Sequence, residues 1–164
     1  FKTASYDIDN QIIKYIRKEY NIEIGNLMAE SIKKNIGSAI ERPIEIATVA
    51  KGRNIFTGLP ESFEITSEEM MEALEECANQ IVEGVHSVLE ETPPELSADI
   101  SDRGIYITGG GGLIYGLDKL IEERTHIPVM VAEDAVSCVA MGTGKALDDI
   151  DVLKEFKSQN KYNM

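Results

Sequence analysis

Four consecutive glycines, residues 109–112, constrain the fold of this chain more than any other feature. The residues before them, Ile-Tyr-Ile-Thr at 105–108, predict a buried strand, and Leu117, Leu120 and Ile121 follow at helical spacing. Glycines at such a junction let a ligand approach the backbone, and the free amide groups at a helix start favour an anion. The segment therefore predicts a ligand-binding loop, with a tightly turned connector as the alternative.

The glycine run matches neither of two common phosphate-binding motifs. No Gly-Lys-Ser or Gly-Lys-Thr follows it, so it is not a P-loop, and its spacing differs from the dinucleotide-binding fingerprint. A second strand at 128–131 and a helix at 136–147 come after the first helix. This alternation is typical of an α/β unit with parallel strands.

Two helices are predicted at the start of the chain. The first is capped by Asp9 and ends near Asn21, and the second begins around Asn26 and ends before Gly37. Their inward residues are expected to be Ile12, Ile13, Ile16 and Tyr20 in the first helix, and Leu27, Met28, Ile32 and Ile36 in the second.

Residues 43–65 change to a period of two, which predicts a small antiparallel sheet with turns at 51–53 and 58–60. Thr66 and Glu69 then form a capping-box pattern, which indicates the start of a long helix that ends at the proline pair 93–94. The inward stripe of this helix is expected to be Met70, Leu74, Cys77, Ile81, Val85, Val88 and Leu89.

The composition excludes several classes of protein. With 43% hydrophobic residues the chain can bury a core, and a net charge of −13 argues against nucleic-acid binding. The two cysteines, Cys77 and Cys138, show no disulfide or zinc spacing, so we expect buried thiols in a reducing cytoplasm. We find no apolar window that predicts a membrane span or a signal peptide. Because the pattern begins abruptly at Phe1, we expect the chain to be a fragment.

Glu30 and Lys33 are a second candidate for a binding site, because residues one turn apart project from the same face of a helix. Their spacing fits a solvated ion pair equally well. Glu30 with Lys34 would serve that structural role just as well.

Several segments follow one another along the chain: Ala-Glu-Ser-Ile-Lys at 29–33 with Ile-Gly-Ser-Ala at 36–39, Thr-Pro-Pro-Glu-Leu-Ser-Ala-Asp-Ile at 92–100, Ile-Thr-Gly-Gly-Gly at 107–111, and nearly all of 125–147. In this order they resemble the MreB family of bacterial actins. The resemblance covers about residues 6–150. It implies an α/β fold, the second domain of an actin-like ATPase with an RNase H-like core.

In that family the chain would be the carboxy-terminal half of the protein. The resemblance implies an RNase H-like lobe made of 1–24 and 81–150, incomplete because its first strands are missing. It also implies a smaller inserted α+β lobe at 25–80 and a polar tail at 151–164.

The resemblance also implies an ATP site. Glu30 would bind the ribose hydroxyls, the stem of Lys33 would stack on the base, and the glycines would lie under the nucleotide. The phosphate loops of the missing half would hold Mg²⁺, so no catalytic residue and no metal ligand is expected here. Gly112 stands where the family has alanine, which we expect to be a harmless exchange. The implied ATP-binding residues are Glu30, Ser31, Ile32, Lys33, Gly109, Gly110, Gly111 and Gly112.

The function that the resemblance implies is that of a cytoskeletal, filament-forming protein that maintains cell shape. Its partners would be copies of itself, head to tail, and membrane-associated cell-shape or motility machinery. It would be cytoplasmic, associated with the membrane as filaments, with no transmembrane segment and no nucleic-acid partner. One alternative is a non-polymerising ATPase of the same superfamily, a chaperone or sugar-kinase relative. Another is a binding module that meets a partner through residues 44–63.

Overall fold

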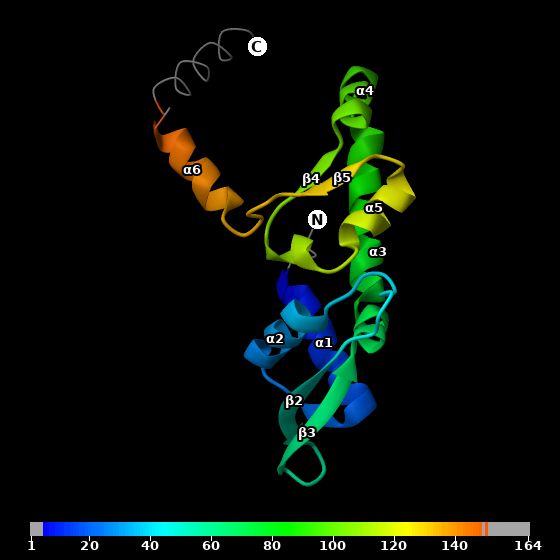
Figure 1. Cartoon of the computed structure of the whole chain (residues 1–164), viewed down its shortest axis with the longest axis vertical. Coiled ribbons are helices and arrows are strands. Elements are labelled where there is room, and N and C mark those ends of the chain that lie inside the picture. Colours follow the sequence, from blue (N-terminus) through cyan, green and yellow to red (C-terminus); the bar gives the residue numbers. More distant parts are fainter. Residues whose placement is uncertain (1–4, 149, 151–164) are drawn as a thin grey trace.

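A computed structural model of the chain describes residues 5–148 and residue 150. The predicted polar tail lies outside the described residues. In Figure 1 the longest helix, α3, runs along much of the molecule, with a helical and antiparallel part at one end and a parallel pair of strands at the other. The elements are α1 (Ser5–Tyr20), β1 (Ile22–Glu23), α2 (Asn26–Ile36), β2 (Ala47–Asn54), β3 (Pro60–Thr66), α3 (Ser67–Glu91), α4 (Pro94–Arg103), β4 (Ile105–Ile107), η1 (Gly110–Leu113), α5 (Leu117–Thr125), β5 (Val129–Val131) and α6 (Cys138–Asp148).

Helix α1 begins before the predicted cap. Asp9 lies in its second turn, so the prediction that Asp9 caps the helix is wrong. The helix ends at Tyr20 because Asn21 adopts the left-handed conformation, with φ 56°. Its buried face includes Ile12 and Ile16, as predicted, and both have no exposed surface.

Helix α2 begins at Asn26, as predicted, and Ile32 and Ile36 are buried, as predicted. Leu27 is 85% exposed, so its predicted inward position is wrong. The buried residues follow the spacing i, i+3, i+4 and i+7, and one of them carries a charge. They are Ala29, Ile32, Lys33 and Ile36.

Strands β1, β2 and β3 form an antiparallel sheet in that order. The turn predicted at 51–53 is wrong, because Lys51, Gly52 and Arg53 pair with residues 60–62 inside the sheet. Gly52 fits there because strand β1 passes close to it. A Cβ atom at this position would lie 2.3 Å from Cγ2 of Ile22 and 2.6 Å from the carbonyl oxygen of Glu23. The chain reverses at residues 55–59 instead.

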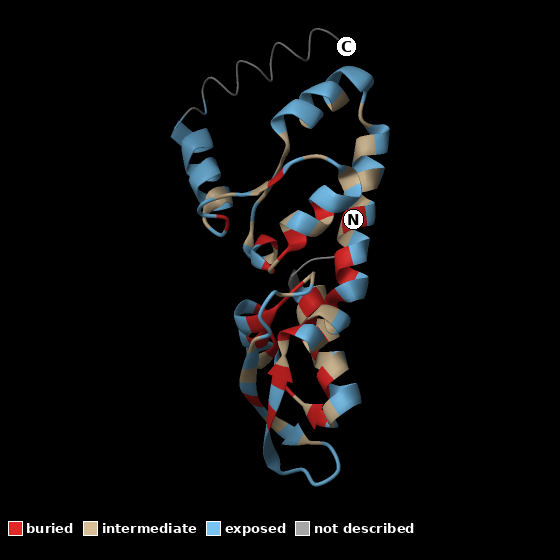
Figure 2. Ribbon diagram, turned by 45° about the vertical axis from the view of Figure 1, so that its right-hand side comes forward, coloured by how far each residue is buried: buried red, intermediate tan, exposed pale blue. Residues whose placement is uncertain are grey.

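Helix α3 has the predicted capping box, in which Thr66 and Glu69 exchange hydrogen bonds between side chain and backbone. Met70, Leu74 and Cys77 are buried as predicted. Val88 is 66% exposed, so its predicted inward position is wrong. The far end of α3 extends past the packed core, and Figure 2 shows that most of its residues there are exposed or half-buried.

Strands β4 and β5 pair in parallel, with Ile105 opposite Val129, as the α/β pattern predicts. Helix α5 begins at Leu117, within the stretch of helical spacing that the sequence predicts. A 3₁₀ turn, η1, and the left-handed residue Gly116 (φ 73°) occupy the intervening residues. Helix α4 was not predicted, and neither it nor α6 has a buried residue in the described part of the chain.

One continuous core, from Ile8 to Val129, joins the helices and antiparallel sheet of the first part of the chain to the part that contains β4, α5 and β5. Helix α1 packs mainly on α2, α3 and β1. Ile8 of α1 also lines a cavity of about 10 Å³ together with Leu74 of α3, and with Ile114 and Leu117, which follow the glycine loop. The division into lobes at 1–24 with 81–150 and at 25–80 stays a prediction.

Candidate functional site

The glycine loop lies directly after strand β4. Gly109 has φ 84°, and its amide donates a hydrogen bond to the carbonyl of Ala135 (2.6 Å). A Cβ atom at Gly110 or Gly111 would meet no atom within 4 Å. The backbone of the loop therefore borders open space, as a close approach by a ligand requires.

Gly112 differs from its neighbours because it is buried. A Cβ atom there would lie 2.4 Å from Cγ2 of Ile107. An alanine, as in the family pattern, would require the Ile107 side chain to shift. Glycine avoids this contact, so the residue tolerated at 112 depends on the side chain at 107. That the exchange is harmless stays a prediction.

The residues that follow the glycine loop pair with the residues that follow α2. Ser38 and Tyr115 form a parallel bridge. The amide of Ala39 donates to the carbonyl of Tyr115 (2.9 Å), and the amide of Tyr115 donates to the carbonyl of Gly37 (3.2 Å). These backbone hydrogen bonds join the residues just after α2 to the residues just after the glycine loop. The sequence separately predicts that α2 and the glycine loop bind a ligand.

Arg42 contacts both sides of this junction. No pattern in the sequence predicted this role. Its guanidinium carbon lies 4.1 Å from the centre of the Tyr115 ring, and its Nη2 donates to the carbonyl of Gly37 (3.2 Å). Gly116 also fits closely, because a Cβ atom there would lie 2.2 Å from Cγ1 of Ile40. Residues that meet only through the tertiary fold cannot be found from periodicity along one helix.

Glu30 pairs with Lys34, the partner that the sequence left open as an alternative. Oε1 of Glu30 lies 2.7 Å from Nζ of Lys34, and their side chains are 42% and 69% exposed. The hydrogen bond from Lys34, and then its charge, hold the pKa of Glu30 below its usual value. Glu30 is therefore an accessible carboxylate that is ready to accept hydrogen bonds.

Lys33 lies on a different side of α2 from Lys34. Its side chain is 6% exposed, and Nζ is 2.7 Å from Oδ1 of Asp9, whose side chain is 14% exposed. Ser31 is exposed and Ile32 is 1% exposed, within the core. Because successive helical residues are about 100° apart, the four predicted residues 30–33 cannot all face one ligand.

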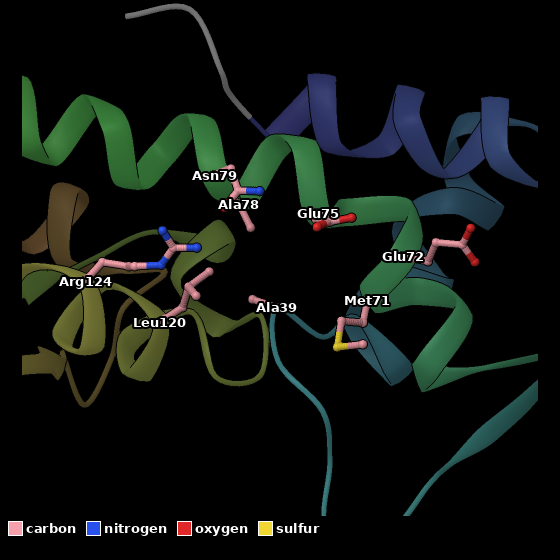
Figure 3. Close-up of a pocket in the computed structure, with 8 residues that line it drawn as sticks. All are labelled: Ala39, Met71, Glu72, Glu75, Ala78, Asn79, Leu120 and Arg124. Carbon is pink, nitrogen blue, oxygen red and sulfur yellow. The ribbon is translucent and has the colours of Figure 1, made fainter.

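A hollow of about 330 Å³ lies elsewhere, between α3 and α5. Figure 3 shows Arg124 and Leu120 of α5 on one side of it, and Glu72, Glu75 and Asn79 of α3 along the other. None of the predicted ATP-binding residues lines this hollow.

The described residues also bear on metal binding and on membrane-spanning helices. Within the described residues, no group of three or more His, Cys, Asp or Glu side chains is placed to hold a metal ion. No helix in the same part of the chain has the length and apolar composition needed to cross a membrane.

Comparison with known proteins gives consistent results. The profile of the MreB/Mbl protein family matches residues 1–155. The cell shape-determining protein Mbl of Bacillus cereus is 44% identical over 152 residues, which cover 93% of this chain and 46% of Mbl. The cell shape-determining protein MreB of Escherichia coli is 49% identical over 148 residues, covering 88% of this chain and 42% of that protein.

A solved structure shares the fold. The crystal structure of MreB 5 of Spiroplasma citri bound to AMPPNP superposes with a TM-score of 0.87 at 39% identity, covering 96% of this chain and 47% of that one. The chain thus has the fold of part of an actin-like ATPase, as the sequence predicts. It spans about half the length of the relatives that it matches.

Proposed function

Because the chain belongs to the MreB/Mbl protein family of actin-like, cell shape-determining proteins, we propose that it supplies the ribose and adenine side of an ATP site in a filament-forming protein that maintains cell shape. The observation that carries the proposal is the open backbone at Gly110 and Gly111, joined by the Ser38–Tyr115 bridge to the end of α2. That junction fixes the loop and the helix relative to each other.

The residues present fit a nucleotide. The loop, Gly109 to Gly112, offers backbone with no side chain in the way at its two central positions. Glu30 is an accessible carboxylate and would accept hydrogen bonds from the ribose hydroxyls. Lys33 would pack its methylene stem along the base, while its ammonium group stays paired with Asp9. Ser31 and Ile32 would position the helix between these two contacts.

The remaining parts of the site would belong to the other half of a full-length protein. That half would hold Mg²⁺ and the phosphates, so this chain would bind and orient the nucleotide but would not cleave it. The relative from Spiroplasma citri is bound to AMPPNP, an ATP analogue, which supports the proposal.

The same family membership supports a proposal that the full-length protein forms filaments. We expect head-to-tail contacts between copies, which extend without closing because the two surfaces in contact are different. The filaments would lie in the cytoplasm beneath the membrane and meet the machinery that shapes the cell or moves it.

The test uses the full-length protein that contains this chain. A Gly110→Ala, Gly111→Ala variant places two methyl groups where the chain itself leaves space, so the fold should persist while a nucleotide is kept away. We expect the Kd for ATP to rise about tenfold or more. Gly25→Ala is the matched control, because a Cβ atom there also meets nothing within 4 Å and Gly25, with φ −91°, lies at the other end of α2 from this junction. Unchanged ATP affinity in the double variant would contradict the proposed site.

Sedimentation of the same proteins tests assembly. We expect the unmodified protein to pellet with ATP and the loop variant to need much more nucleotide. A protein that binds ATP but never pellets, across salt and temperature, would favour the non-polymerising ATPase instead.

A further inference from the structure

The ion pair between Asp9 and Lys33 is unlike the others in the described part of the chain. Its side chains are 14% and 6% exposed, whereas every charged side chain in the other three pairs is at least 41% exposed. The pair joins α1 to α2, two helices that pack directly on each other. It is the one pair here that has been taken almost completely out of water.

Burial of this kind is a poor way to stabilise a fold. Removing two charges from water has a large free-energy cost, and the attraction between them often only offsets that cost. Apolar residues of the same size frequently stabilise as well or better. The pair therefore fixes the position of the Lys33 ammonium group more directly than it stabilises the fold.

Both ends of the pair are rigidly held. Asp9 lies between Ile8 and Ile12 on α1, which are 3% and 0% exposed. Lys33 follows Ile32 and precedes Ile36 on α2, which are 1% and 2% exposed. A lysine side chain has four rotatable bonds and loses rotamer entropy when it is fixed. Because the backbone of Lys33 lies in α2 and its ammonium group is paired with Asp9, its methylene stem keeps one conformation.

The contact depends on charge rather than on an aligned hydrogen bond. Oδ1 of Asp9 is buried and accepts no hydrogen bond of good geometry, although Nζ of Lys33 is 2.7 Å away. An asparagine would keep the shape of the Asp9 side chain and remove its charge. It should therefore remove the attraction of Asp9 for the ammonium group without leaving a cavity.

We propose that Asp9 is a positioning residue that holds the stem of Lys33 in the path needed to contact the base of ATP. This inference rests on the proposed ATP site. Asp9 does not touch the nucleotide itself but acts through Lys33. Its effect should therefore appear only with ligands that carry a base.

The experiment is a double-mutant cycle in the full-length protein, with Asp9→Asn, Lys33→Met and both changes together. We expect each single change to weaken ATP binding about tenfold, and the double variant to bind no more weakly than Lys33→Met. Affinity for inorganic triphosphate, which lacks ribose and base, should stay unchanged in all three. A purely structural role would weaken both ligands together, or neither.

Lys18→Met is the matched control, because it makes the same chemical change at an exposed ion pair, with Glu19, that contains none of the proposed ATP-binding residues. Should Asp9→Asn fail to fold, Asp9→Glu keeps the charge and moves the carboxylate by one methylene group. We expect Asp9→Glu to remain folded and to bind ATP several-fold more weakly.

The possible outcomes separate this inference from the proposed function. Wild-type affinity for ATP in a folded Asp9 variant, or losses that add in the double variant, would overturn the role of Asp9 and leave the ATP site standing. Normal ATP binding by Lys33→Met would also overturn it, since nothing would then need positioning. Absence of ATP binding by the unmodified protein would instead refute the proposed function.

Discussion

Individual glycines in this chain serve opposite purposes, which only their surroundings distinguish. Gly52 is closely surrounded, because a Cβ atom would meet both the Ile22 side chain and the Glu23 backbone. Gly110 and Gly111 border open space. The first kind of glycine allows two strands to pack, and the second kind leaves room for a ligand.

Replacing Gly52 with alanine should destabilise the small sheet. The added methyl group would force β1 and β2 apart, and overpacking of this kind costs about 1–3 kcal/mol. We expect the denaturant midpoint of Gly52→Ala to fall accordingly. In Gly144→Ala, an alanine in a helix with free space should leave stability equal or slightly higher. Equal stability of Gly52→Ala and the wild type would contradict the close contact with β1.

At the scale of elements, the start of α3 connects three parts of the structure. The Thr66 amide donates to Oε2 of Glu69 (2.9 Å), and the Glu69 amide donates to the Thr66 hydroxyl (3.3 Å). Tyr20, which ends α1, donates its hydroxyl hydrogen to Glu69 or to the carbonyl of Glu64. Burial and then the hydrogen bond to Glu69 raise the pKa of Tyr20.

Loss of the capping hydroxyl should weaken α3. We expect Thr66→Ala to lower the free energy of unfolding by about 1 kcal/mol, because one amide at the helix start loses its partner. Thr66→Ser keeps the hydroxyl and should cost much less. Chemical denaturation of both variants makes the comparison, and an equal loss in the two would show that the methyl group, not the cap, matters.

At the scale of the whole molecule, the two ends of the chain are packed very differently. Helix α6 has no buried residue in the described structure, and Figure 1 shows it standing apart from the rest. It nevertheless carries apolar side chains, and Val139 and Leu147 are 69% and 61% exposed. Since the matched relatives are about twice as long, we expect the other half of a full-length protein to cover this helix.

Hydrogen exchange can test that expectation. In the isolated chain, amides of α6 should exchange quickly, because little tertiary packing protects them, while those of β2 and the first half of α3 should exchange slowly. In the full-length protein, α6 should become protected. Fast exchange of α6 in both proteins would show that the helix is not covered.

Features that depend on residues close together in the chain could be predicted from the sequence alone. The start of α2, the capping box of α3 and the parallel pairing of β4 with β5 follow from periodicity, caps and the order of elements. The motifs at 29–39 and 107–111 likewise indicated the family and the fold. Each of these signals lies within a few residues, so the identities of neighbours suffice to encode it.

The tertiary structure alone decided which side chains meet across the fold. It placed Asp9 against Lys33 and stacked Arg42 on Tyr115. It also placed Gly52 inside a strand, where the sequence pattern had predicted a turn. It also left Leu27 exposed while burying a lysine on the same helix. Such contacts join residues that are distant in sequence. Their geometry depends on how whole elements pack, which no local pattern records.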